Sequence, residues 1–188
     1  MSHAEQEAAT AVVLDYLAHG RTDEGRPRYE QAPLAHALGV SQFRLYELIL
    51  EADASVSIGE ELAVRPPEPP IEEFRQLTYD DLSSGAEAEL EYAVEELIER
   101  YEDRFVAVYS EAQPITLRLH QLNLLPGIGD KLRDDILDAR KRGPFTDFEN
   151  ITERIDGLYD PADIIKERIL TELRDPDLKY HLFVGGPY

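Results

Sequence analysis

The chain of 188 residues has no cysteine and no tryptophan, and only four of its 19 basic residues are lysines. The lack of cysteine excludes disulfides, thiolate catalysis and thiolate zinc ligands. The chain also lacks an apolar run near the roughly 20 residues of a membrane-spanning helix. Its first residues show no basic start and no cleavage pattern of a secretory signal. We therefore expect a cytoplasmic protein without a membrane partner.

The charge balance is extreme, because 39 acidic residues outnumber 19 basic ones and the net charge is −20. An acid-rich, lysine-poor composition resembles that of proteins from salt-loving archaea, in whose molar salt the Debye length shrinks to about 3 Å. An ordinary acidic protein that repels nucleic acid is the alternative. Residues 111–174 hold 10 basic and 13 acidic side chains and are close to neutral. This stretch is therefore where a polyanion could approach.

The first third of the chain has the short, glycine-punctuated apolar segments of a β-rich domain. Residues 11–17 predict a strand, residues 31–39 a short strand or turn, and residues 55–59 and 61–64 two strands joined by a turn. Residues 41–50 fit a strand or a helix equally well. The pattern predicts a small barrel of the oligonucleotide-binding (OB) type.

The proline-rich segment at residues 66–70 predicts a stiff linker and a domain boundary. After it, Thr78 and Asp81 have the spacing of a capping box at a helix start. Residues 86–103 follow a helical period with a glutamate-rich face. We thus expect an α+β protein with a β-rich OB-like domain (1–66), a linker with an acidic helix (67–110) and a helical domain (111–188).

The spacing of the leucines predicts the first helix of the helical domain, and later segments predict further helices. Leu117, Leu119, Leu122 and Leu125 are expected to line one helix, and Ile136 and Leu137 continue on the next. Two further helices are expected at residues 148–155 and 161–173. Pro161 suits a first helical position, where its missing N–H costs nothing.

The stretch Leu125-Pro126-Gly127-Ile128-Gly129, between two predicted helices, resembles the turn of a helix-hairpin-helix module. Gly127 and Gly129 can adopt positive φ and leave the backbone bare, so a phosphate can approach closely. The N–H groups of Gly127, Gly129 and Asp130 then face an anion at the positive end of a helix. The alternative is a plain turn between helices.

Neighbouring side chains extend this predicted grip on a phosphate. Lys131 can add a charge-assisted contact, and Arg133 is a weaker candidate. Ile128 is expected to pack inward and hold the two helices together. Because such contacts grip the backbone, they position a protein without reading sequence.

Further cations precede the helix stop at Gly143-Pro144. Arg140, Lys141 and Arg142 either complement the helix dipole or form a phosphate patch, and the sequence favours neither. Phe145 and Phe148, which follow, are expected in the core. This link resembles the one between paired helix-hairpin-helix motifs in competence-type DNA-binding domains.

A second turn around Gly157 departs from the pattern of the first. Tyr159 replaces the second glycine, and Asp156 and Asp160 flank the turn. We expect this turn to pack without gripping, although Lys166 and Arg168 on the following helix could still touch phosphates.

Taken in order, V-L-D-Y-L near the start, the proline linker, the acidic helix, L-x-x-L-x-L-L-P-G-I-G-D-K and G-P-F-x-x-F resemble the archaeal domain-of-unknown-function family 655. The resemblance covers residues 12–184 and is most specific over residues 117–155. It implies a nucleic-acid-binding protein with an OB-like barrel and a helix-hairpin-helix half. Such proteins are encoded near translation genes, which favours RNA over DNA and admits ribosomal or translation proteins as partners.

Two other function classes compete with nucleic-acid binding. Gly143-Pro144 and Asp147 mimic the loop and catalytic Asp of base-excision glycosylases, but no large helical domain for a base pocket is present, so we expect a non-enzymatic protein and interpret Asp147 as a cap. The acidic helix at residues 87–103 could instead bind a basic protein.

The five histidines are scattered without metal spacing, and we expect no metal, catalytic residue or cofactor. Tyr16, Phe43 and Tyr46 could stack on bases but are better candidates for the core.

Overall fold

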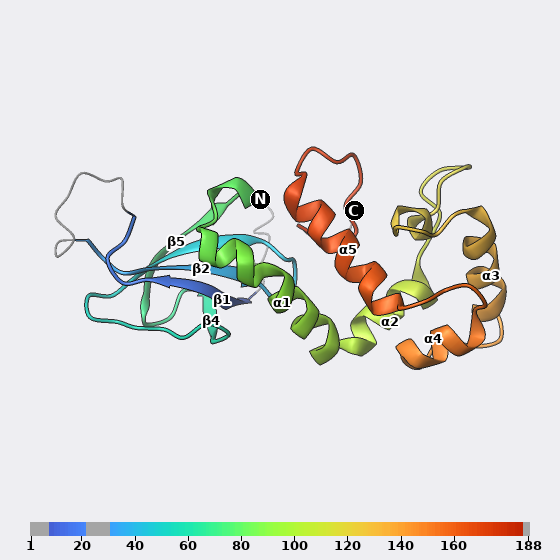
Figure 1. The fold of residues 1–188 in the computed structure, drawn as a ribbon, viewed down its shortest axis with the longest axis horizontal. Coiled ribbons are helices and arrows are strands. Elements are labelled where there is room, and N and C mark those ends of the chain that lie inside the picture. Colours follow the sequence, from blue (N-terminus) through green and yellow to red (C-terminus); the bar gives the residue numbers. More distant parts are fainter. Residues whose placement is uncertain (1–7, 22–30, 186–188) are drawn as a thin grey trace, which may run out of the picture. The chain divides into compact units, whose positions relative to one another are not determined.

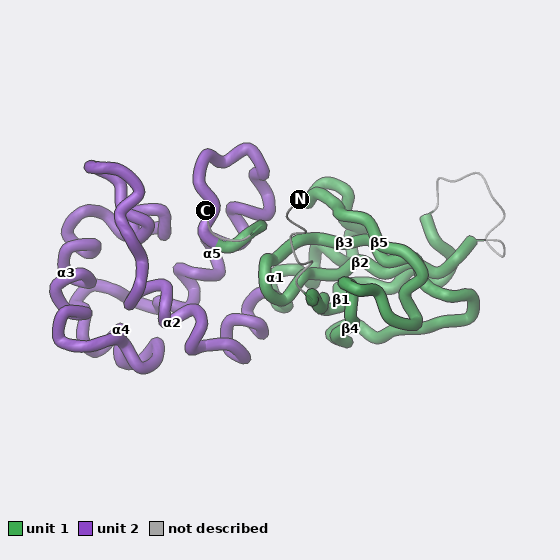
Figure 2. The backbone as a smooth tube through the Cα atoms, turned by 180° about the vertical axis from the view of Figure 1, so that it is seen from behind, with its two compact units in different colours: residues 1–93, 183–187 green, residues 94–182, 188 purple. Residues whose placement is uncertain are grey.

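The computed structural model describes residues 8–21 and 31–185 and divides the chain into two compact units (Figure 2). The first unit runs to Ala93 and includes the segment from Phe183, and the second comprises Val94–Leu182. His3 lies outside the described residues. The sequence placed the boundary at residue 66, in the proline-rich segment, but the units divide later, so both the linker and the next strand belong to the first unit.

The first unit is built on one five-stranded antiparallel sheet that curls into a half-barrel (Figure 1). The strands are β1 (Ala9–Leu17), β2 (Leu34–Gly39), β3 (Leu45–Leu50), β4 (Glu61–Arg65) and β5 (Ile71–Leu77). Their order is β4-β1-β2-β3-β5. No pairing joins β4 to β5 among the described residues, so the sheet is an open half-barrel where the sequence predicted a small barrel.

Alternation along the strands gives the sheet a core on one face. Ala11 and Val13 of β1, Ala35 and Ala37 of β2, and Leu48 of β3 all belong to one buried apolar cluster. Successive residues of a strand face opposite sides, so the remaining residues of β2 and β3 point to the other face. Because almost every residue of β2 and β3 is buried, both faces of these central strands are covered.

Two expectations for this unit are wrong. Residues 55–59 form turns and irregular backbone, and they precede β4 without pairing as a strand. The proline-rich segment at 66–70 is a turn, since Ile71 N–H donates to Glu68 O at 2.9 Å and the chain then enters β5. Strand β5 pairs with β3 along its length, which keeps the segment inside the sheet. Composition predicted an extended spacer because the long-range pairing of β5 leaves no local signal.

A row of polar side chains crosses the other face of the sheet. Asp15, His36, Glu47 and Arg75 are successive partners across β1, β2, β3 and β5. Glu47 accepts a hydrogen bond from Arg75 Nε at 2.7 Å and lies 3.3 Å from His36 Nε2. Burial raises the pKa of Glu47, but hydrogen bonds from Arg75, Arg21 and His36 outweigh it and leave the pKa below its ordinary value.

This polar row anchors the first helix. Ser83 N–H donates to His36 Nδ1 at 3.1 Å, and Ser83 Oγ donates to Asp15 at 2.7 Å. Helix α1 (Ser84–Arg100) starts immediately afterwards. The predicted capping box of Thr78 and Asp81 is confirmed, although it caps the N-terminus of a 3₁₀ helix at Tyr79–Asp81 that precedes α1.

The second unit is helical (Figure 1). After α1 come α2 (Glu102–Glu111), the 3₁₀ helix η3 (Gln121–Leu124), α3 (Asp130–Arg140), α4 (Phe148–Arg154) and α5 (Pro161–Arg174). The two helices expected at 148–155 and 161–173 are confirmed, and so is the place of Pro161 in the first turn of α5.

The single helix expected from Leu117 to Leu125 is wrong. Residues 114–120 form a loop closed by a bridge between Pro114 and His120, and Leu117 at its tip is fully exposed. Leu122 and Leu125 are buried, but they belong to η3 and the residue after it. The leucine spacing fitted a helical period, yet Pro114 and a tight turn of Ile115 N–H and Thr116 N–H onto Leu119 O interrupt it.

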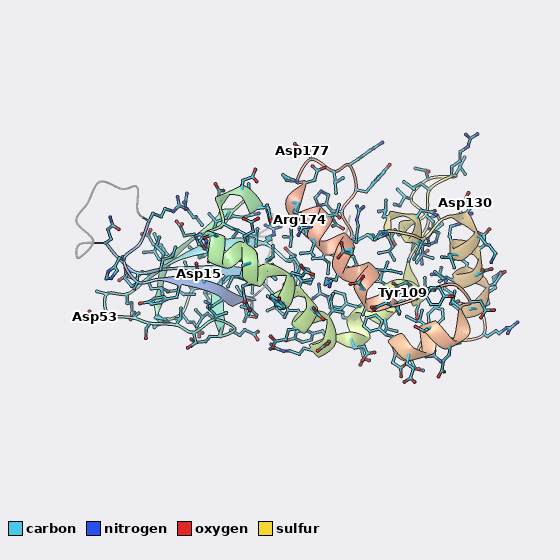
Figure 3. All side chains as sticks on the ribbon, viewed as in Figure 1. Asp15, Asp53, Tyr109, Asp130, Arg174 and Asp177 are labelled. Atoms are coloured by element: carbon cyan, nitrogen blue, oxygen red, sulfur yellow. The ribbon has the colours of Figure 1, made fainter. Side chains whose placement is uncertain are left out.

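Two polar groups bind the helices of this unit to one another. The hydroxyl of Tyr109 on α2, among the helices in Figure 3, donates to Pro161 O on α5 at 2.7 Å. Burial raises the pKa of this hydroxyl, so it stays a donor. Arg154 on α4 donates to the carbonyls of Ala139 at 2.6 Å and Gly143 at 3.0 Å, and its guanidinium lies 4.5 Å from the ring centroid of Phe145. Arg154 therefore satisfies carbonyls at the end of α3.

Candidate functional site

The candidate site is the turn that leads from η3 into α3. Leu125 ends η3, Ile128 N–H donates back to Leu125 O at 3.2 Å, and Gly129 is the N-cap of α3. Ile128 is 4% exposed, so the expected inward packing is confirmed. Gly127 has φ 79°, a left-handed conformation that favours glycine. Buried apolar residues thus hold a turn whose glycines remain on the surface.

The first N–H groups of α3 have no acceptor among the described residues. Gly129 makes no side-chain cap, and the first backbone bond of the helix is from Arg133 N–H to Gly129 O. The amides of Asp130, Lys131 and Leu132 therefore remain as donors, with Asp130 at the edge of the second unit in Figure 3. Their partial positive charge favours an anion.

Only one of the two glycines is required by backbone conformation. Gly129 has φ −85° and ψ −170°, extended backbone that any residue adopts, so the expectation of positive φ fails there. A Cβ at Gly129 or at Gly127 would meet no atom within 4 Å. What glycine provides at 129 is bare backbone in open space.

The second turn repeats the first over four residues. Gly157 has φ 85°, Leu158 N–H donates to Ile155 O at 3.4 Å, and Leu158 is 1% exposed. A Cβ at Gly157 would lie 3.8 Å from Leu132 in the first turn of α3, so the two turns are neighbours. The sequence related the two segments, and this shared backbone pattern supports that relation.

The second turn then closes the helix end that the first leaves open. It is one residue longer, and its N-cap Asp160 accepts the N–H of Asp163 at 3.1 Å. Pro161 at the start of α5 removes a further donor. The Asp160 carboxylate thus accepts an N–H group that an anion at the start of α5 would otherwise contact.

The cations beside the first turn are paired. Lys131 is 86% exposed and lies 2.9 Å from Asp135 one turn along, and this hydrogen bond raises the pKa of Lys131. Exposed pairs of this kind contribute little to stability and exchange partners easily. Arg133 is mostly covered and contacts Asp130 and Asp134. Of these two predicted contacts, Lys131 is the one that can turn to a phosphate.

The three cations at the end of α3 have different surroundings. Arg140 is half-buried, donates to Tyr109 O at 3.4 Å, and burial lowers its pKa. Lys141 is exposed and paired with Asp138 at 3.1 Å. Arg142 is exposed, and its guanidinium has no partner among the described residues. Arg140 therefore acts in packing, while Lys141 and Arg142 remain available at the surface.

A polar network that the sequence did not predict fixes η3 against the turn. His120 is buried and its Nδ1 accepts Leu122 N–H at 3.0 Å. Asn123 accepts His120 N–H and donates to Ile128 O at 3.4 Å. Arg133 reaches the same Asn123 oxygen at 3.3 Å. Burial, with smaller contributions from Arg140 and Arg133, lowers the pKa of His120 and keeps the ring neutral.

Other predicted candidates have structural partners. Arg168 donates to Leu124 O at 3.2 Å and Tyr180 O at 2.6 Å, and Lys166 is largely covered beside Asp163. Both cations are therefore held by other groups of the fold. Asp147 accepts Asn150 N–H at 2.7 Å, which confirms its interpretation as a helix cap.

Three of the five aromatic residues predicted for the core are buried, and the other two are half-buried. Phe43 and Tyr46 are buried, and the half-buried Tyr16 donates its hydroxyl to Ala54 O at 2.8 Å. Phe145 is buried and Phe148 half-buried.

In residues 8–21 and 31–185, no group of three or more acidic or histidine side chains could hold a metal ion. Every helix in these residues is too short or too polar to cross a bilayer.

Comparison with known proteins shows one matching family and two similar proteins. The family model described as "Protein of unknown function (DUF655)" matches residues 7–185. The uncharacterized protein MJ0038 of Methanocaldococcus jannaschii is 37% identical over 177 residues, which are 93% of this chain and 78% of that protein. The crystal structure of Af1531 from Archaeoglobus fulgidus, also described as DUF655, has a TM-score of 0.84 at 34% identity and covers 94% of this chain and 99% of its own.

Proposed function

Because the chain belongs to the DUF655 family, whose description assigns no function, we propose one from its geometry: it binds the sugar–phosphate backbone of nucleic acid at the start of α3. The turn Leu125–Gly129 presents the backbone and Lys131 adds a mobile charge. The contact is independent of sequence, and the protein is not an enzyme. RNA is favoured over DNA on the family resemblance alone.

One observation carries this proposal, namely the difference between two neighbouring turns of the same design. The N-terminus of α5 is closed by Asp160 and Pro161. The N-terminus of α3 has neither a side-chain cap nor a side chain on its N-cap residue. A helix end that is left open beside a closed copy, with open space around its glycines, suits an anionic ligand.

In this proposal, η3 with α3 and α4 with α5 form a pair of helix-hairpin-helix units, one binding and one structural. The half-barrel has the strand number of an OB fold. Its central strands β2 and β3 are covered on both faces, so we assign it no oligonucleotide contact. The binding surface consists of Gly127, Gly129 and Lys131, with Lys141 and Arg142 as outlying contacts.

The net charge of −20 bears on how such binding works. Each cation that neutralises a phosphate adds roughly −0.9 to the slope of log affinity against log salt on duplex DNA and about −0.7 on single strands. With few free cations at the site, we propose a shallow salt dependence in which backbone N–H donors supply much of the affinity. This suits a cytoplasm of high salt, where a cationic surface would be screened.

The test is titration of fluorescently labelled single-stranded and duplex RNA and DNA at low and at molar salt. The proposal expects binding that Lys131→Glu and Gly129→Asp both weaken strongly. Arg174→Gln, at an exposed cation in the last turn of α5, serves as the matched control for a cation outside the site. Binding by the wild type that neither turn variant weakens would mean that the turn is only scaffold.

A second candidate is binding of a basic protein by the acidic face of α1. Glu95, Glu96 and Glu99 are exposed on that face, and the exposed ring of Tyr92 lies among them. An aromatic residue within a charged face is typical of interaction surfaces. Binding of a basic ribosomal protein that Tyr92→Ala abolishes, together with absence of nucleic-acid binding, would favour this candidate.

A further inference from the structure

Tyr159 lies in the second turn, and its exposed ring does not contribute to the packing of the core. Its side chain is 78% exposed, and its hydroxyl has no hydrogen-bond partner among the described residues. The turn itself depends on other residues, since Leu158 packs inward and Asp160 caps α5. An apolar ring so far in water is a candidate for contact with a ligand.

Tyr159 lies within reach of the proposed phosphate contact. A Cβ at Gly157 would be 3.8 Å from Leu132 Cδ2, and Asp156 acts electrostatically on Lys131. Two residues of chain span at most about 7 Å, so the Cα of Tyr159 lies within roughly 12 Å of the Leu132 side chain. A long aromatic side chain can close much of that distance.

The charges of the second turn decide which part of a nucleotide can approach the ring. Asp156 and Asp160 repel a phosphate, and the α5 donors are already capped. A base is uncharged and has a π face that stacks on an aromatic ring whatever its identity. These charges disfavour a phosphate beside the ring and leave an uncharged base as the part of a nucleotide that suits it.

We infer that Tyr159 is a stacking platform for an unpaired base of a nucleic acid whose phosphate occupies the start of α3. This inference rests on the proposed function and narrows the ligand to a single strand, a loop or a bulge. Bases within a duplex are already stacked and cannot present a face to the ring.

The absence of tryptophan makes this site directly observable. In Tyr159→Trp the new indole is the sole tryptophan of the chain, and stacking on a base should quench its emission. The probes are a single-stranded ten-nucleotide RNA, an abasic strand of the same length, and a blunt duplex. Quenching is expected with the RNA that carries bases and is absent with the abasic strand.

Affinities of three proteins test the same contact. Wild type and Tyr159→Phe should bind the strand with bases roughly 5- to 150-fold more tightly than the abasic strand. Tyr159→Ala should lose this preference and keep the abasic affinity. Because the side chain of Tyr159 is exposed, the melting temperature of Tyr159→Ala should equal that of the wild type.

Three results overturn the inference. The first is that Tyr159→Ala binds the strand with bases as tightly as the wild type does. The second is that the tryptophan emission of Tyr159→Trp stays unchanged at saturation. Either result would show that the ring does not stack on a base. An equal loss on the duplex would assign the ring to some other contact. Failure of the proposed function looks different, because the wild type would then bind neither the abasic strand nor the strand with bases.

Discussion

The sharpest prediction concerns Gly129, where stability and binding should change in opposite directions. Gly129→Asp places a carboxylate at the N-cap of α3, whose extended backbone suits an N-cap side chain. The chain provides a template, since Asp147, the N-cap of α4 with extended backbone, accepts Asn150 N–H at 2.7 Å. The new carboxylate should likewise accept an N–H of the first turn of α3.

The expected gain in stability is modest. Asp exceeds Gly at an N-cap by a few tenths of a kcal/mol, and a negative charge near the helix start adds about 0.3–1 kcal/mol. The sum, about 0.5–1.5 kcal/mol, corresponds to a rise in melting temperature of roughly 1–6 °C for a chain of this size. No clash offsets it, because a Cβ at Gly129 meets no atom within 4 Å.

Binding should fall at the same time. Hydrogen bonds to a charged group contribute about 1.5–3 kcal/mol, so loss of the phosphate contact weakens binding roughly 10- to 150-fold. Gly129→Asn occupies the same donors without the charge and should lose less, and Gly129→Ala only crowds the phosphate. Calorimetric melting and oligonucleotide titration of these three variants provide the measurements.

A Gly129→Asp variant that melts higher and still binds as the wild type does would contradict a phosphate contact at the start of α3. A lower melting temperature would instead contradict the cap geometry. The three substitutions separate these outcomes, since a steric effect should appear already in Ala and an electrostatic one only in Asp.

Three further predictions test the site and its support. Gly127→Ala and Gly157→Ala, both at positive φ, should each cost about 1–2 kcal/mol, but only Gly127→Ala should also weaken nucleic-acid binding; equal binding losses would contradict the division of roles. Arg154→Ala should lower the free energy of unfolding, measured in urea, by about 2–4 kcal/mol, because the carbonyls of Ala139 and Gly143 lose their hydrogen-bond donor. Arg154→Lys should restore part of this stability. His120 has a lowered pKa and is neutral in the fold, so protonation of the unfolded chain below its ordinary value of 6.5 should reduce stability by at most about 1.4 kcal/mol per pH unit. Urea unfolding at pH 7.5 and 5.5 should show a smaller loss for His120→Asn, and an equal loss would exclude His120 as the cause.

Local patterns predicted what local physics controls. The capping box of Thr78 and Asp81 depends on a few adjacent residues, and so does the proline at the start of α5. Both are confirmed. The same holds for Asp147 as a cap. Hydrogen bonds within three residues and the fixed φ of proline act before any tertiary contact forms.

Patterns without a local cause led to errors. The leucines from 117 to 125 fit a helical period, but a bridge between Pro114 and His120 closes a loop instead. The proline-rich segment fitted a linker, but the pairing of β5 with β3 draws it into the sheet. Strand pairing joins residues far apart in sequence, and no window of the sequence carries that information.

The sequence by itself determined the turn, its glycines and the cations around it, and it determined that the second copy departs from the first. The tertiary structure decided which of these groups are available to a ligand. Arg133, Arg140 and Arg168 are cations in the sequence, yet ion pairs or carbonyls hold them in the fold. Availability depends on burial and on partners contributed by other helices, so only the assembled unit distinguishes the open start of α3 from the closed start of α5.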